Sequence, residues 1–346
     1  MTVQEITRPA RTVPADAPTL ADVARMAGVS IATASRVLNN SAPVSVGARQ
    51  LVRSAASRLG YVRHRAAPKH PRQKVRSVAA VLYANCERIF ADPFFARLIC
   101  GATEEFARHG VPMMLISVND ARLPMVEQYI HSGHFDGIVV LADHGEHPLA
   151  ESLPASGVPM TLVGRPTNPT PAPYVDADNR TGARNAVEYL IRQGRRAIAT
   201  VAGPPNKAVG ADRLAGYRDA LAGAGLSELP VAYGDWSQAS GVHAMSRLLD
   251  QRPALDAVFV ASDVMATGAL WALQRAGRRV PEDVAVIGFD DLALAAHTRP
   301  RLTTVRQPIE QFGAVAAQQL LSCLDGGHED ILPTLLPTTL VVRDST

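Results

Sequence analysis

The sequence predicts an N-terminal all-α helix-turn-helix head followed by a larger α/β two-lobed body of parallel, doubly wound sheets. Three observations predict this architecture. A chain of 346 residues suits two or three domains rather than one core. Apolar residues recur at helical spacing before residue 60, and strand-length apolar runs alternate with amphipathic segments after residue 77. The composition, 47% hydrophobic and 19% charged, is typical of globular proteins.

Charge is distributed unevenly along the chain. The whole chain carries +3, but residues 18–76 contain eleven Lys and Arg residues and one acid, Asp22, a net charge of +10. Residues 1–17 are balanced, so the remainder carries −7. A small basic head on an acidic body is typical of a polyanion-binding module joined to a sensor domain. The alternative is a solvated basic face that binds nothing.

Three short helices are expected in the head. Thr19 can cap the first in a capping-box pattern, and Gly28 can adopt the left-handed turn after it. Ser30 can cap a second helix over 31–38, and a third is expected over 45–59. The inward-facing residues are expected to be Ala34, Val37 and Leu38 on the second helix and Leu51, Val52 and Ala55 on the third.

Two helices joined by a tight Gly turn form a helix-turn-helix, whose second helix enters the major groove of DNA. Arg36 is the main candidate for guanine, because its planar guanidinium matches two acceptors. Ile31 and Ala32 offer only apolar contact, for example to a thymine methyl. The complete predicted set, including residues expected to hold phosphates, is Thr19, Ser30, Ile31, Ala32, Thr33, Ser35, Arg36, Asn39, Ser45, Arg49, Tyr61 and Arg65.

The head resembles the lactose-repressor (LacI/GalR) family of bacterial regulators. The signature comprises TLADVA at 19–24, AGVS at 27–30, TASRVLN at 33–39, VS at 44–45 and LGYV at 59–62, with Ala34 in place of the usual Val. In that family a short hinge helix follows the head and inserts a Leu into the minor groove. Here His70 replaces that Leu between Pro68 and Pro71. A Pro inside a helix costs about 3 kcal/mol or more, so any hinge helix is expected to end by His70. The linker then either places cations such as Arg65 along the DNA or is a tether without groove contact.

The body is expected to alternate strands and helices in two series. Strands are expected at 78–83, 113–118, 137–141 and 161–163, then at 197–201, 257–260 and 284–287. Helices are expected at 94–109, 180–193, 210–224, 241–249 and 264–276. This alternation predicts parallel sheets, and two series divided near 176–179 predict two lobes facing across a cleft.

The body is also similar to the family, so the resemblance covers nearly the whole chain. The matching segments include DGI at 136–138, RLAGY at 213–217, GDW at 234–236, VPEDV at 280–284, VIGFDD at 286–291 and LTTV at 302–305. The resemblance implies a periplasmic-binding-protein-like body in which the chain crosses back near Gln307. The expected domains are a tail at 1–17, the head at 18–63, a linker at 64–76, and an effector-binding and dimerisation domain at 77–343, with an N-lobe of about 77–176 plus 308–335 and a C-lobe of about 177–307 plus 336–343.

Ligands of parallel α/β sheets bind beyond the carboxyl ends of the strands, and the family pattern selects the same positions. Arg213 and Asp290 are expected to hold the hydroxyls of a sugar, or alternatively to form an interlobe ion pair. Trp236 and Phe289 are expected to stack on the sugar, or alternatively to be core aromatics. The complete predicted effector set is Asp92, Phe94, Phe95, Asp143, Arg165, Arg213, Trp236, Ser262, Asp263, Phe289 and Asp290.

Other classes of protein are disfavoured. The N-terminus has no long apolar run, so neither a secretory signal nor a membrane span is expected, which places the protein in the cytoplasm. The sequence has no Gly-rich phosphate loop and no G-x-S-x-G elbow, so an enzyme is not expected. The cysteines lack metal-ligand spacing, and His134 and His144 flank a strand too long for both to bind one ion. No cofactor is therefore expected, with a metal site inside 143–147 as the alternative.

The sequence therefore predicts a DNA-binding regulator, in its simplest form a repressor, whose operator affinity changes when a small molecule binds between the lobes. The expected effector is a sugar, or alternatively another small molecule such as a nucleobase. No leucine heptads follow the body, so a homodimer that reads a near-palindromic operator is expected rather than a tetramer. A solute receptor without a DNA role is the alternative from another class.

Overall fold

The computed structural model describes most of the chain and divides it into two compact units, 1–73 and 74–346. The described residues are 19–39, 44–59, 77–83, 86–119, 121–141, 157–168, 170, 172–326 and 332–346. The expected tail at 1–17, the linker at 64–76, and the candidate site residues Tyr61, Arg65 and Asp143 lie outside them, as does the side chain of Asn39.

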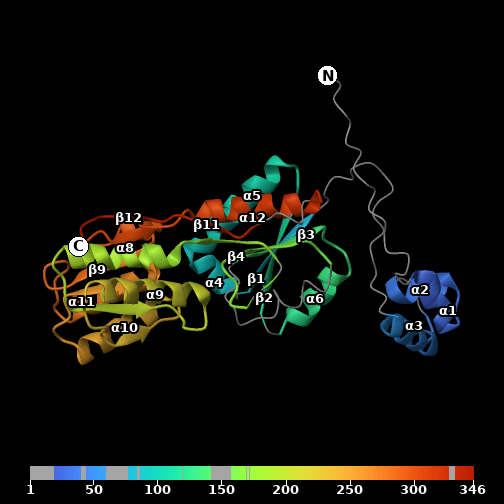
Figure 1. The fold of residues 1–346 in the computed structure, drawn as a ribbon, viewed down its shortest axis with the longest axis horizontal. Coiled ribbons are helices and arrows are strands. Elements are labelled where there is room, and N and C mark those ends of the chain that lie inside the picture. The colour runs from blue at the N-terminus through green and yellow to red at the C-terminus, as the bar shows by residue number, and fades with distance from the viewer. Residues whose placement is uncertain are drawn as a thin grey trace, which may run out of the picture. The chain divides into compact units, whose positions relative to one another are not determined.

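The head contains the three expected helices, α1 (Leu20–Ala27), α2 (Ile31–Asn39) and α3 (Val46–Leu59) (Figure 1). The capping box is present, because the Thr19 side chain accepts the Asp22 N–H while the Asp22 carboxylate accepts the Thr19 N–H at 2.9 Å. Gly28 has φ 65°, the left-handed conformation expected for the turn that separates α1 from α2.

The core of the head corrects one expectation about α3. Val52 and Ala55 are buried against Val23 of α1 and Val37 of α2, as expected. Leu51 is 57% exposed, so its predicted inward orientation was wrong. Successive helical residues are about 100° apart around the axis, so a helix that centres Val52 on the core turns Leu51 away from it.

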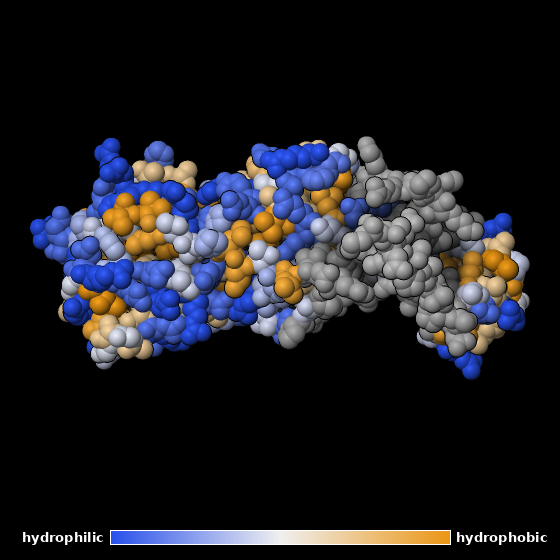
Figure 2. Space-filling model, turned by 45° about the horizontal axis from the view of Figure 1, so that its top comes forward, coloured by the Kyte–Doolittle hydropathy of each residue, from blue (hydrophilic) through white to orange (hydrophobic). Residues whose placement is uncertain are grey.

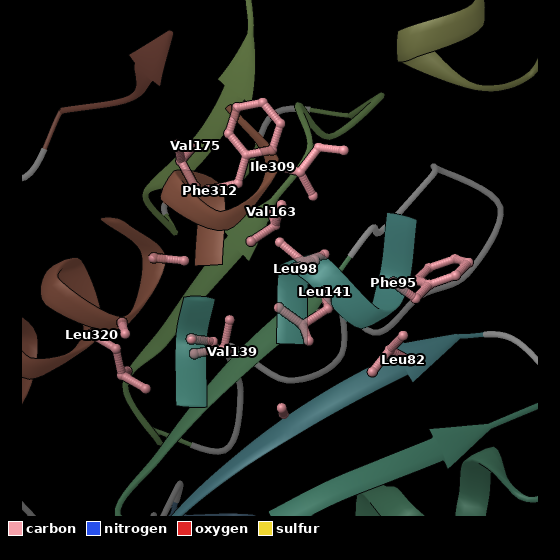
Figure 3. Packing of buried hydrophobic residues seen from close by; sticks show 14 of the residues in the cluster. Leu82, Phe95, Leu98, Val139, Leu141, Val163, Val175, Ile309, Phe312 and Leu320 are labelled. Atoms are coloured by element: carbon pink, nitrogen blue, oxygen red, sulfur yellow. The ribbon is translucent and has the colours of Figure 1, made fainter. Parts of the chain in front are cut away.

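The N-lobe of the body is a six-stranded parallel sheet in the order β11-β5-β4-β3-β1-β2. Its strands are β1 (Val78–Tyr83), β2 (Met113–Val118), β3 (Gly137–Leu141), β4 (Met160–Val163), β5 (Tyr174–Ala177) and β11 (Thr334–Leu336). Its helices are α4 (Cys86–Ala91), α5 (Pro93–Arg108), α6 (Leu123–His131) and α12 (Ile309–Leu324). The cluster under α5 and α12, drawn in Figure 3, takes Val78, Ala80 and Leu82 from β1. The cluster under α6 takes the alternate residues Ala79 and Val81, so both faces of the sheet are covered.

The C-lobe repeats this architecture with the order β12-β10-β9-β8-β6-β7, in which only β12 is antiparallel to its neighbour. Its strands are β6 (Ile198–Ala202), β7 (Val231–Tyr233), β8 (Ala257–Val260), β9 (Ala285–Asp290), β10 (Thr303–Arg306) and β12 (Thr339–Val341). Its helices are α8 (Asn179–Arg192), α9 (Ala208–Gly223), α10 (Gln238–Gln251), α11 (Asp263–Arg275) and the short 3-10 helix η2 (Ala293–Ala296). The helices α8 and α9 cover one face of the sheet, and α10 and α11 cover the other (Figure 1).

The chain passes between the lobes three times. It leaves the N-lobe sheet after β5, returns between β10 and α12, and leaves again between β11 and β12. The strands β5, β7, β10, β11 and β12, each three or four residues long, were not among the expected elements. Within the described residues, no helix combines the length and apolar character needed to cross a membrane.

Candidate effector pocket and nucleic-acid interface

A pocket lies between the two lobes of the body. The N-lobe contributes three lining residues from the start of α5. The C-lobe contributes the last residue of β9, residues that follow β7, β8 and β10, and residues of α9 and α11. The lining consists of Asp92, Phe94, Phe95, Val209, Arg213, Trp236, Ser262, Val264, Asp290 and Gln307. Seven of the eleven predicted effector residues are therefore brought together, whereas Val209, Val264 and Gln307 were missed.

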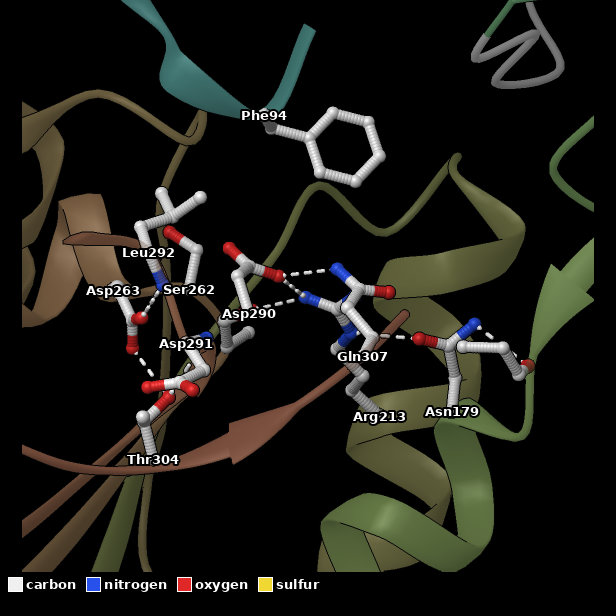
Figure 4. A network of polar contacts seen from close by, with 12 residues as sticks. Phe94, Asn179, Arg213, Ser262, Asp263, Asp290, Asp291, Leu292, Thr304 and Gln307 are labelled. Atoms are coloured by element: carbon white, nitrogen blue, oxygen red, sulfur yellow. Dashed lines mark hydrogen bonds and ion pairs between the residues drawn. The ribbon is translucent and has the colours of Figure 1, made fainter. Parts of the chain in front are cut away.

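Arg213, on α9, is the buried cation of the pocket and is only 4% exposed. Its Nη1 donates to Asp290 Oδ1 at 3.2 Å and to the Ala261 carbonyl at 2.6 Å, and its Nε donates to Asn179 Oδ1 at 2.9 Å (Figure 4). Burial lowers the pKa of the guanidinium, and the carboxylate of Asp290 opposes this shift. A buried charge is tolerated when it is paired and hydrogen-bonded in this way.

Asp290, the last residue of β9, supplies the opposite charge. Its Oδ1 also accepts a hydrogen bond from Gln307 Nε2 at 2.6 Å. Burial raises the pKa of Asp290 to about 7, against the lowering effect of Arg213. The pocket thus places a carboxylate, a guanidinium and a primary amide side by side, a set that can both accept from and donate to hydroxyl groups.

Three aromatic side chains line the pocket, Phe94 and Phe95 from the N-lobe and Trp236 from the C-lobe. Phe94 comes from α5, and its ring meets the Phe95 ring edge to face at 5.7 Å between centroids. Trp236 comes from the C-lobe, with its ring centroid 5.8 Å from the Arg213 guanidinium carbon. Gly203 allows the indole to lie close to the end of β6, because a Cβ there would be 2.2 Å from Trp236 Cη2. Aromatic faces beside hydroxyl-binding groups match the two kinds of surface that a sugar presents.

The capping residues Asp92 and Ser262 orient the helices that begin at the pocket. Asp92 Oδ1 accepts the Phe94 N–H at 3.0 Å, which starts α5. Ser262 Oγ accepts the Met265 N–H at 3.2 Å, which starts α11. Both helix N-termini therefore lie at the pocket wall.

Three predicted effector residues do not line the pocket. Phe289 is 0% exposed and lies beneath Arg213, with 3.6 Å between its ring centroid and the guanidinium carbon, so its position corresponds to the core-aromatic alternative and not to sugar stacking. Arg165 forms a bidentate ion pair with Asp212 of the other lobe, the shorter contact being 2.8 Å. Asp263 is 0% exposed and binds groups of the C-lobe interior. Adjacent strand residues point to opposite faces, so Phe289 and Asp290 cannot both face the effector.

The second helix of the head presents the predicted DNA-contacting residues. Ile31 is 55% exposed, and Ala32 and Arg36 are exposed with it. Ser30 caps the helix, because its Oγ accepts the Thr33 N–H at 3.1 Å. The first turn of a helix has backbone N–H groups without an intrahelical partner, so the starts of α1 and α2 suit phosphate contacts. The outward face of α2 is thus one apolar pair, two hydroxyl residues and one arginine.

A helix-turn-helix head joined to a two-lobed body with a polar and aromatic interlobe cleft defines the class of ligand-responsive DNA-binding regulators. Residues 19–64 match the model for bacterial regulatory proteins of the lacI family, and residues 187–346 match the periplasmic binding protein-like domain. The regulator CelR of Thermobifida fusca is 41% identical over 336 residues, covering 95% of this chain and 98% of CelR. The repressor CytR of Escherichia coli is 34% identical over 335 residues, covering 95% of this chain and 96% of CytR.

Solved structures support the same classification as the sequence relatives. A CelR–cellobiose complex superimposes with a TM-score of 0.77 at 40% identity, covering 95% of this chain and all of that chain. A lac repressor dimer bound to operator and the anti-inducer ONPF superimposes with a TM-score of 0.71 at 27% identity, covering 95% of this chain and 98% of that chain. The chain belongs to the LacI family of bacterial transcriptional regulators. The expected family, fold class and role as a DNA-binding regulator with an effector-binding body, not an enzyme, are confirmed.

Proposed function

We propose that the effector of this regulator is a sugar, and that a glucose disaccharide such as cellobiose is the first candidate. The observation that carries this proposal is the pairing of Phe94 and Trp236 with the Arg213–Asp290–Gln307 group in one interlobe pocket. The 41% identical relative CelR, whose solved complex contains cellobiose, supports the choice of a disaccharide. The C–H faces of a sugar can lie against the rings of Phe94 and Trp236, while its hydroxyls form hydrogen bonds with Arg213, Asp290 and Gln307.

The test of the sugar proposal is isothermal titration of the purified protein with cellobiose, lactose and ribose, followed by operator binding with and without the tightest ligand. Asp290→Asn should weaken binding by about 10- to 150-fold, since a hydrogen bond to a charged group contributes about 1.5–3 kcal/mol. Asp219→Asn is the matched control, because Asp219 pairs with Arg180 on the surface. Undiminished binding by Asp290→Asn, or binding of no sugar in the panel, would contradict the proposal.

We infer that the DNA-contacting residues predicted from the sequence act through α2, and that Arg36 recognises guanine. Its exposure beside Ile31 and Ala32 supports direct contact with base edges. Ser30, Thr33 and Ser45 provide hydroxyls at helix starts, where phosphates are commonly held. Because operator binding takes place on the chromosome, we also place the protein in the cytoplasm.

We infer that the protein acts as a homodimer and that part of the dimer interface is the apolar face of the N-lobe formed by β2 and α6. The edge strand β2 exposes Met114 by 52%, and α6 on the same side of the sheet exposes Met125 by 63% and Tyr129 by 46%. Clustered exposed apolar residues of this size are typical of protein interfaces. Figure 2 shows that apolar residues form separate clusters among hydrophilic ones on the face drawn there. The occupant is a second copy, because the related lac repressor is described as a dimer on its operator. Two heads would then read a near-palindromic site.

A further inference from the structure

The turn that follows β9 has an unusual backbone. Asp290 has φ 115° and Asp291 has φ 53°, both in the left-handed region that residues other than glycine rarely adopt. Backbone of this kind persists only where the surrounding contacts hold it in place. The contacts of the segment Asp290–Leu292 therefore indicate what the turn is built to do.

The C-lobe holds the turn through the buried carboxyl group of Asp263. Its Oδ2 accepts the Leu292 N–H at 2.8 Å, and its Oδ1 accepts the Thr304 hydroxyl at 2.6 Å (Figure 4). The carboxyl group also packs against β9, because a Cβ at Gly288 would lie 2.3 Å from Oδ1. Burial and the nearby Asp290 raise the pKa of Asp263 well above its usual range. Asp263 does not line the pocket, yet it fixes the segment that carries Asp290.

The same turn also reaches the other lobe. The Leu292 side chain is 1% exposed and belongs to the apolar cluster of the N-lobe that contains Phe95 and Leu98. The carbonyl of Asp291 accepts a hydrogen bond from Arg97 Nη1 of α5 at 3.3 Å. Arg97 is itself fixed by a bidentate pair with the Glu310 carboxylate of α12, at 2.6 and 2.8 Å. The turn thus presents Asp290 to the pocket, and the Asp291 carbonyl and the Leu292 side chain to the N-lobe, while Arg306 and Arg343 of the C-lobe hold the Asp291 carboxylate.

We propose that Asp263 is a positioning residue for effector recognition, and that the turn it holds couples the Asp290 carboxylate to the docking of Leu292 in the N-lobe. This inference rests on the proposed function of the pocket as the effector site. Because the three residues are consecutive in one over-determined turn, the Asp290 carboxylate cannot move far without moving Leu292. An effector that binds Asp290 while Leu292 is docked in the N-lobe therefore has a higher affinity for the closed lobes than for the open lobes. A ligand needs such a difference in affinity to shift the equilibrium between the two states.

The first test measures lobe closure without any effector. Spin labels at Ala107→Cys on α5 and Ser246→Cys on α10, both exposed, report the interlobe distance by double electron–electron resonance. The native cysteines are replaced by alanine, and labelled chains are diluted with unlabelled ones so that a dimer carries one labelled pair. Leu292→Ala should lower the closed-to-open ratio at least tenfold. Leu248→Ala, a matched cavity in the C-lobe core, should leave the ratio within twofold.

The second test separates positioning from stability. Asp263→Asn should preserve cellobiose affinity within about threefold, because an amide oxygen can accept the Leu292 N–H while its NH2 donates to Thr304. Asp263→Ala should weaken cellobiose binding at least tenfold and shift the distances toward open. If that variant does not fold, Thr304→Val removes one of the two hydrogen bonds at nearly constant shape, with an effect in the same direction.

The outcomes distinguish this inference from the sugar proposal. If the wild-type protein binds no sugar of the panel, the sugar proposal fails while the distance measurement still decides the present one. A wild-type protein without a closed population, or a Leu292→Ala variant with unchanged distances, overturns the coupling. A folded Asp263→Ala protein with a lower melting temperature, but with wild-type interlobe distances and wild-type cellobiose affinity, shows that Asp263 is structural only.

Discussion

Gly203 lies under the indole of Trp236, and Gly203→Ala should damage the effector pocket without touching the effector. The added Cβ would lie 2.2, 2.6 and 2.9 Å from three atoms of the ring, Cη2, Cζ2 and Cζ3. Ordinary contact begins near 3.4 Å, so the ring must shift by roughly 1 Å or more. Trp236 has φ 74°, which restricts how its backbone can move to relieve the clash.

The expected magnitude follows from the cost of overpacking. Extra methyl groups in packed sites typically cost about 1–3 kcal/mol, which corresponds to roughly 5- to 150-fold in affinity if the cost falls on the bound arrangement. Isothermal titration with cellobiose measures this loss. Quenching of tryptophan fluorescence by acrylamide reports the displaced ring without a ligand, against the constant contribution of the other tryptophan, Trp271.

Gly223→Ala is the matched control for this prediction. A Cβ at Gly223, the last residue of α9, meets no atom within 4 Å, so the variant should keep wild-type quenching and affinity. The reasoning is refuted if Gly203→Ala shows wild-type quenching and affinity, since the ring would then tolerate a contact that the packing forbids.

Four further predictions concern the rest of the chain. Arg36→Ala should weaken operator binding by about 1–3 kcal/mol in a salt-controlled competition assay while effector affinity stays constant; unchanged specificity would exclude direct readout. Sugar affinity should rise as pH increases through about 7, because the ionised carboxylate of Asp290 is the acceptor. The stability of the folded protein should change in the opposite direction, because the raised pKa of Asp290 favours the protonated folded state. The contribution of Asp290 to the free energy of unfolding is therefore complete below pH 3.8 and is lost as pH passes 7. Titration calorimetry and thermal melts from pH 5.5 to 8.5 measure both, and a flat affinity profile would contradict the role of the carboxylate. Met125→Asp should shift the protein toward monomer in analytical ultracentrifugation, and an intact dimer would move the interface elsewhere. In the head, Val52→Ala should cost about 2 kcal/mol in denaturant unfolding, but Leu51→Ala less than about 0.5 kcal/mol; equal costs would place Leu51 in the core after all.

The sequence by itself determined the elements whose signals are local. The capping pattern at Thr19, the turn at Gly28 and the apolar spacing of α1 and α2 depend on residues at most a few positions apart, so they could be predicted. Alternating strands and helices likewise predicted two parallel sheets. The strand-end rule then placed Arg213, Trp236 and Asp290 at one cleft, because it depends only on chain direction.

Only the tertiary structure decided which of two neighbouring side chains faces the interlobe pocket. The pleat of β9 turns Phe289 into the core, where it supports Arg213, and leaves Asp290 at the pocket. Asp263 binds Leu292 and Thr304, which are 29 and 41 positions away, and Arg165 meets Asp212 across the lobes. Such pairings have no local pattern, because they are set by how the sheets and helices pack once the chain has crossed between the lobes three times.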